Sequence, residues 1–189
     1  MKDDRGFTLV ELIVVMAIMG VVITFGVIKS EVLFSYNAQE CYKKVMSTLK
    51  TEKVQVLAHS TMIGSMDVAK SDGSVSDDVK NYGVYIEFYV DGNSIYTKTY
   101  VKGTAKEEKG SKVAGKGVTI LYKLTGESTL QTLTESEGRG LMFSYNRATG
   151  AFFPYKDGKY VEEIHVLGGS REYKMRLMKK TGKVVRHGR

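Results

Sequence analysis

One carboxylic acid lies inside an otherwise apolar stretch near the beginning of the chain. Glu11 is the only charged residue between Gly6 and Ile28. This stretch of about 22 residues would measure roughly 33 Å as a helix, enough to cross a hydrocarbon core of about 30 Å. A charge inside a bilayer costs about 2.5–3.5 kcal/mol, so we expect a cationic partner for Glu11. A cut after Gly6 would supply one, because it frees an amine on Phe7 one helical turn from Glu11.

The residues around this acid carry a specific resemblance. The segment Gly6-Phe7-Thr8-Leu9-Val10-Glu11 resembles the processing motif, or class III signal peptide, of type IV prepilins and of type II secretion and competence pseudopilins. The resemblance implies that a membrane-bound prepilin peptidase and methyltransferase cuts after Gly6 and methylates Phe7. It also implies that Glu11 meets the N-terminal amine of a neighbouring subunit, with assembly platform proteins as further partners. An ordinary secretory signal peptide needs a shorter apolar core and a small-residue cleavage site, which this stretch lacks.

Four parts of the chain follow from this interpretation. They are a leader at 1–6 that is removed, a transmembrane or filament-core segment at 7–28, an amphipathic helical continuation at 29–60, and an extracytoplasmic β-rich domain at 61–189. No proline interrupts positions 7–60, and apolar residues recur there at spacings near three and four: Phe34, Ala38, Cys41, Val45, Leu49, Val56 and Leu57. We expect one long helix that passes once through the cytoplasmic (inner) membrane with its N-terminus inside. Assembly would then carry the domain to an extracytoplasmic filament or the cell surface.

The remainder of the chain has the alternation of apolar and polar residues that is typical of strands. The expected strands span 82–90, 94–101, 118–124, 141–145, 151–155, 160–167, 171–178 and 183–187. The polar segments 64–80 and 103–117 are expected to be loops. The expected fold class is therefore α+β, with a long N-terminal helix packed on an antiparallel sheet or small sandwich. The resemblance implies the same arrangement, the pilin fold.

Residues with the spacing of a catalytic or metal site do not occur in the sequence. His59, His165 and His187 are far apart, and there is no G-x-S-x-G or H-E-x-x-H run. Four aspartates fit no defined calcium loop: Asp67, Asp72, Asp77 and Asp78. The single cysteine, Cys41, permits no internal disulfide and is expected to pack as a small apolar residue. We therefore expect no enzymatic activity, no metal and no cofactor.

Two further features leave alternatives open. Five tyrosines crowd the first expected hairpin, where they either pack across the strands or form a contact surface: Tyr82, Tyr85, Tyr89, Tyr96 and Tyr100. The net charge is +7, and a basic C-terminus supplies candidates for gripping DNA phosphates: Lys179, Lys180, Lys183, Arg186 and Arg189. Solvated strand faces are also often basic, so both interpretations of this cluster stand.

The C-terminal third shows a second, looser resemblance. Segments 143–150, 173–177 and 181–184 resemble the minor pseudopilin H and FimT-like branch. The predicted function is therefore a structural, minor subunit of a type IV pilus or of a type II secretion-like pseudopilus. A DNA-uptake (competence) pilin is the alternative within the family. Outside it, the alternative is a bitopic membrane protein whose exterior domain binds a partner, and an uncut N-terminus would point there.

Overall fold

A computed structural model describes residues 8–187, except for the side chains of residues 25–30 inside the first helix. The helices in this part of the chain are α1 (Leu9–His59) and α2 (Asp77–Tyr82). The strands are β1 (Val84–Asp91), β2 (Ser94–Val101), β3 (Thr104–Ala105), β4 (Ser111–Ala114), β5 (Val118–Leu124), β6 (Gln131–Thr132), β7 (Leu141–Phe143), β8 (Val161–Gly168), β9 (Arg171–Met178) and β10 (Lys183–Arg186). All strand pairs are antiparallel, which confirms the α+β class with an N-terminal helix.

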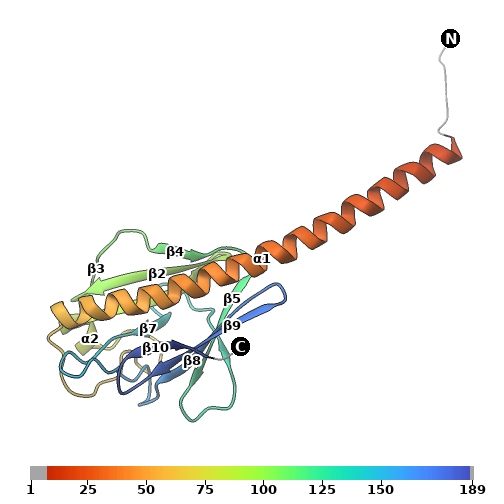
Figure 1. Ribbon diagram of the computed structural model, residues 1–189. Coiled ribbons are helices and arrows are strands. Elements are labelled where there is room, and N and C mark those ends of the chain that lie inside the picture. Colours follow the sequence, from red (N-terminus) through yellow and green to blue (C-terminus); the bar gives the residue numbers. More distant parts are fainter. Residues whose placement is uncertain (1–7, 188–189) are drawn as a thin grey trace.

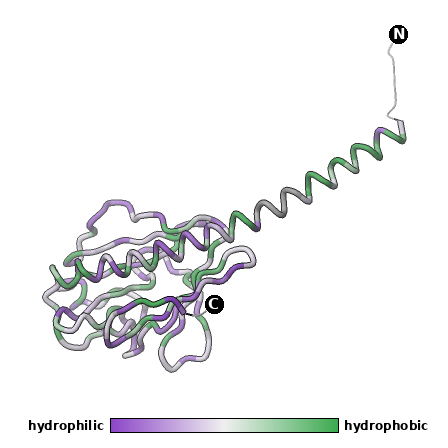
Figure 2. Tube along the Cα trace, in the orientation of Figure 1, coloured by the Kyte–Doolittle hydropathy of each residue, from purple (hydrophilic) through white to green (hydrophobic). Residues whose placement is uncertain are grey.

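Helix α1 runs without interruption for 51 residues and has two different halves. Figure 1 shows that its N-terminal half projects beyond the sheets, while the C-terminal half lies along them. Figure 2 shows that the projecting part is largely hydrophobic. In the second half, one face is buried against the sheets, as the spacing predicts: Ala38, Cys41, Val45, Leu49 and Val56. The helix ends after His59, where the Ser60 N–H donates to the Val56 carbonyl oxygen at 2.8 Å.

Two five-stranded sheets form the rest of the domain. The first has the order β3-β2-β1-β7, with β4 also paired to β2, and the second has the order β10-β9-β8-β5-β6. Helix α1 contacts β1 and β4 of the first sheet and β5, β8, β9 and β10 of the second. Side chains from the helix and from both sheets join in one hydrophobic cluster. The helix therefore holds the two sheets together as part of one core.

The β8–β9 hairpin meets α1 at close range. A Cβ atom on Gly168 would collide with the Phe34 carbonyl oxygen and the Ala38 side chain. Gly169 has φ +57° and lies against the Glu31 carbonyl oxygen. Glycine is needed at this turn for two reasons, because the backbone is left-handed and because the helix leaves no room for a side chain.

Three of the expected elements differ from the structure. Segment 103–117 contains β3 and β4, which pair with the edge of β2, so a Lys/Gly-rich composition did not prevent strand pairing. Segment 64–80 overlaps α2, which begins at Asp77 and includes Tyr82. The expected strand at 151–155 is wrong. The segment keeps a single antiparallel bridge, between Phe152 and Tyr145. Its last two residues bond to an irregular loop, with Val68 N–H donating to Pro154 and Ala69 N–H donating to Tyr155. The sequence could not reveal this pairing, because the partner loop lies more than 80 positions earlier in the chain.

Candidate functional site

Thr8 and Glu11 form a reciprocal cap at the beginning of α1. The Glu11 N–H donates to Thr8 Oγ1 at 3.2 Å, while Glu11 Oε2 accepts bonds from the Thr8 N–H at 2.9 Å and the Thr8 hydroxyl at 3.0 Å. This is a capping box, and it satisfies backbone donors that have no partner inside the helix. The Thr-x-x-Glu spacing is a sequence signal for this cap. The cap occupies Oε2 and leaves Oε1 to accept from another group.

The helix that follows Glu11 exposes apolar side chains on all sides. Large examples are more than half exposed, such as Met16 at 69% and Ile23 at 63%. No charged residue occurs between Glu11 and Ile28. An apolar surface of this kind marks contact with a membrane or with other protein. In the chain as far as it is described, no helix is both long and apolar enough to cross a membrane.

Gly6 and Phe7, the predicted cleavage residues, lie outside the described residues. Their roles and that of Glu11 therefore stay predictions. The same holds for the division of the chain at positions 6, 28 and 60.

The cationic residues proposed for DNA lie on two different surfaces. Lys179 Nζ lies 5.4 Å from the ring centroid of Tyr160, and Lys180 lines the same groove together with Arg176. Arg186 lines another groove, which also contains Tyr42 of α1. Lys183 belongs to β10 and is close enough to Lys53 to affect it: burial lowers the pKa of Lys53, and the charge of Lys183 lowers it further. Arg189, the last of the proposed residues, lies outside the described residues.

Two side chains of types that are often reactive, Cys41 and His165, are buried inside the domain. Cys41 is fully buried, and burial raises the pKa of its thiol to about 12, so the thiolate is not formed near neutral pH. His165 is also buried, with Nδ1 at 2.7 Å from Glu172 Oε1 and Nε2 at 3.3 Å from Glu163 Oε2. Within residues 8–187 no three His, Cys, Asp or Glu side chains are arranged to hold a metal ion.

One buried carboxyl group, that of Glu87, is not indicated by the sequence pattern. Glu87 is fully buried on β1, where Oε1 accepts N–H bonds from Gly138 at 2.7 Å and Gly140 at 2.9 Å. Its Oε2 atom has no hydrogen-bond partner in the described part of the chain. Burial raises the pKa of this carboxyl group. Glu87 occupies a polar position of an alternating strand, so nothing in the local pattern indicates that the loop at 136–140 covers it.

Most tyrosines of the first hairpin pack across its strands. Tyr85 stacks on Tyr100 with ring centroids 4.6 Å apart, and Tyr89 stacks on Tyr96 at 5.8 Å. Tyr82 differs from them, because it belongs to α2 and is 61% exposed. The packing interpretation therefore accounts for four of the five side chains.

Comparison with known proteins gives one match. Residues 1–27 match the prokaryotic N-terminal methylation motif. The match includes Gly6, Phe7 and Glu11, and it supports a place in the type IV pilin and pseudopilin family, whose members are processed by a prepilin peptidase. No curated protein and no solved structure matches the chain.

Proposed function

We propose that this protein is a structural subunit of a type IV filament machine, either a pilus or a type II secretion-like pseudopilus. The observation that carries the proposal is the methylation motif at 1–27, followed by an exposed apolar helix with Glu11 as its only charged residue up to position 28. A helix that is apolar on all sides needs lipid or other helices around it. A filament core made of such helices satisfies this need after the subunit leaves the membrane.

The proposed sequence of events is the one that the methylation motif implies. The chain is inserted in the inner membrane with its N-terminus inside, cut after Gly6 by the prepilin peptidase, and methylated at Phe7. Glu11 Oε1 then accepts a hydrogen bond from the N-terminal amine of a neighbouring subunit, while Oε2 keeps the cap with Thr8. Pairing removes the cost of an isolated charge in an apolar core, and it fixes the register between neighbouring helices.

The finer assignment is a minor subunit of the pseudopilin H and FimT-like branch. It rests on the resemblance of segments 143–150, 173–177 and 181–184. The single cysteine agrees with it, because Cys41 is buried in the core and cannot form the disulfide that closes a C-terminal loop in many pilins.

Mass spectrometry of sheared filaments tests the proposal. Filaments released from cells should contain this protein with a methylated Phe7 as its first residue. High abundance would indicate a major subunit and trace abundance a minor one, while processed protein retained in the membrane would indicate a short pseudopilus. An intact leader would overturn the proposal and favour a bitopic membrane protein.

A Gly6→Leu variant provides the matched control for processing. It should accumulate with residues 1–6 still attached, because the side chain blocks the cut that the motif implies. A correctly cut Gly6→Leu protein would show that another site is used.

DNA binding is the second candidate function. One observation favours it: Lys179 lies over the Tyr160 ring, with Arg176 and Lys180 in the same groove, and such aromatic and cationic surfaces suit nucleic acids. We expect salt-sensitive binding of a duplex oligonucleotide that Lys179→Gln and Lys180→Gln together weaken about tenfold. Equal binding by this double variant and by the wild type would exclude the groove as the DNA site.

A further inference from the structure

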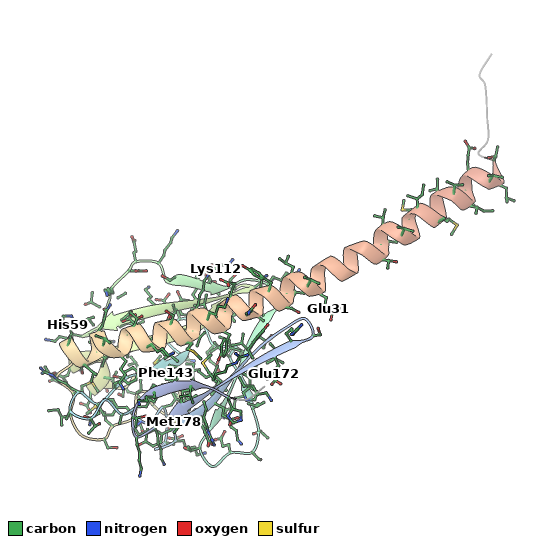
Figure 3. All side chains as sticks on the ribbon, viewed as in Figure 1. Glu31, His59, Lys112, Phe143, Glu172 and Met178 are labelled. Atoms are coloured by element: carbon green, nitrogen blue, oxygen red, sulfur yellow. The ribbon has the colours of Figure 1, made fainter. Side chains whose placement is uncertain are left out.

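A second groove lies at the corner where α1 meets the β8–β9 hairpin and β10. Its volume is about 820 Å³, and its lining includes Gln39 and Tyr42 of α1, Arg171 of β9 and Arg186 of β10. Figure 3 labels Glu172, another lining residue, and Glu31, which marks the level at which the hairpin turn meets the helix. The groove is therefore close to the end of the domain from which the apolar half of α1 projects.

Tyr42 has an unsatisfied hydroxyl group at this groove. The side chain is only 8% exposed, and its ring packs 5.7 Å from the ring of Tyr173. The hydroxyl is buried and has no hydrogen-bond partner among the described residues. Buried polar groups in native proteins are nearly always bonded, so an unpaired tyrosine hydroxyl calls for an acceptor that the described part of the chain does not supply.

The charges around the groove also call for an acceptor. No carboxylate of residues 8–187 forms an ion pair with Arg171 or Arg186. The two glutamates of the lining contact other cationic or imidazole groups: Glu172 contacts His165 at 2.7 Å and Lys174 at 3.1 Å, and Glu163 contacts His165 at 3.3 Å and His187 at 3.8 Å. Beside these two carboxylates, the groove presents donors to a ligand, namely the guanidinium groups of Arg171 and Arg186, the Tyr42 hydroxyl and the NH₂ group of Gln39.

We propose that this groove binds the phosphate group of a phosphate ester. The donors come from a helix and from two strands, so they approach a ligand from several directions. A tetrahedral phosphate has oxygens in several directions, whereas a planar carboxylate can be satisfied by one arginine. A groove of about 820 Å³ also has room for the organic part of the ester. The ester is either a lipid headgroup or a soluble phosphate ester.

The site does not depend on the filament function. Cleavage after Gly6 and pairing of Glu11 involve the opposite half of α1, so either proposal can fail while the other stands.

Titration calorimetry of the full chain in maltoside detergent micelles, which contain no phosphate, tests the site, with inorganic phosphate and glycerol 1-phosphate as probes. We expect saturable binding that weakens about tenfold in Arg171→Gln or Arg186→Gln and about threefold in Tyr42→Phe. Two control variants should bind as the wild type does: Lys50→Gln, which makes the same charge change at an exposed position of α1, and Tyr36→Phe, which alters a tyrosine of α1 that is 58% exposed.

A second arm of the experiment identifies the source of the phosphate. In phosphatidylglycerol nanodiscs, a headgroup that occupies the groove should compete with the added probes in the wild type but not in an Arg171→Gln, Arg186→Gln double variant. An unchanged affinity in those nanodiscs would assign the site to a soluble ester. Absence of saturable binding, equal affinity in the double variant, or equal displacement by acetate at the same ionic strength would overturn the proposal.

Discussion

Glu11 bonds to Thr8 in its own chain, and the proposed function gives it a second partner in a neighbouring subunit. Its Oε2 atom caps the helix through Thr8, and Oε1 is left for the amine of a neighbouring subunit. The two demands are compatible because a carboxylate has two oxygens, each with more than one acceptor site. A variant that keeps the cap and removes the charge can therefore separate the two roles.

Glu11→Gln should spare membrane insertion and cleavage after Gly6 but reduce recovery of the protein in sheared filaments about tenfold or more. The glutamine carbonyl can still accept from Thr8, while the attraction to an amine is lost, and about 1.4 kcal/mol already corresponds to tenfold. Quantitative mass spectrometry of filaments and membranes checks this. Thr8→Ala, which removes the cap and keeps the charge, should have a smaller effect, and the reverse order would contradict the pairing.

The buried carboxyl group of Glu87 leads to a prediction about how folding stability depends on pH. Burial raises its pKa above the ordinary value of 4.5, so protonated Glu87 favours the folded state. This contribution is fully present below about pH 4.5 and is lost as the pH rises through the raised pKa. Glu87→Gln removes the titration, and its carbonyl can still accept from Gly138 and Gly140. The variant should be at least as stable as the wild type at about pH 7, with a smaller loss of stability as the pH rises.

Thermal unfolding of the full chain in detergent, recorded from about pH 4 to 8, checks this. Glu127→Gln is the control of opposite sign. Hydrogen bonding from Lys159 at 2.9 Å lowers the pKa of Glu127, so its contribution is present above pH 4.5 and is lost as the pH falls. Parallel pH profiles for Glu87→Gln and the wild type would contradict the assignment.

At the scale of the element, the contact between α1 and the β8–β9 turn restricts which residues the turn can contain. The turn residue Gly169 has φ +57° and faces the Glu31 carbonyl oxygen and Ser35 Oγ. Gly158 also has a positive φ, +71°, but nothing lies within 4 Å of its would-be Cβ atom. A substitution at Gly158 therefore tests backbone strain alone, whereas the same substitution at Gly169 tests backbone strain together with collision with the helix.

Gly158→Ala should cost about 1 kcal/mol of folding free energy, from the left-handed backbone alone. Gly169→Ala should cost a further 1–3 kcal/mol or so, because the hairpin has to move away from α1. Chemical denaturation of both variants measures the difference. Equal costs would mean that the hairpin can shift on the helix without loss.

The whole molecule consists of a folded domain and an apolar projection. Burial on α1 begins at Ala38 and continues through Cys41, whereas the described side chains up to Thr24 are exposed. The domain therefore draws its stability from the second half of the helix. The first half adds a surface for lipid or for other subunits.

Deletion of residues 1–28 should leave a soluble domain whose unfolding free energy stays within about 1 kcal/mol of that of the full chain, because the described buried residues of α1 begin at Ala38. Deletion of residues 1–41 should cost several kcal/mol, because it removes Ala38 and Cys41 from the core. Circular dichroism and denaturant titration compare the two. Failure of the shorter deletion to melt cooperatively would show that the projecting helix supports the domain.

The sequence by itself determined the features that depend on near neighbours. The Gly6-Phe7 junction and Glu11 can be recognised from a few adjacent residues. The long helix is predicted by the absence of proline from positions 7–60 and by the spacing that places Ala38, Cys41 and Leu49 on one buried face. Strand alternation likewise depends on adjacent residues, which is why β1, β2, β8 and β9 were anticipated.

Only the tertiary structure decided which distant residues meet. Residues 151–155 look like a strand, but they form only one bridge, and residues 154 and 155 bond to positions 68 and 69. The chain folds Glu87 beneath glycines 51 and 53 positions away, and it brings Arg171 and Arg186 to Tyr42 of α1. It also divides the basic C-terminus between two grooves. The physical reason is that strand pairing and helix packing join segments far apart in the chain, and periodicity along one segment does not specify its partner.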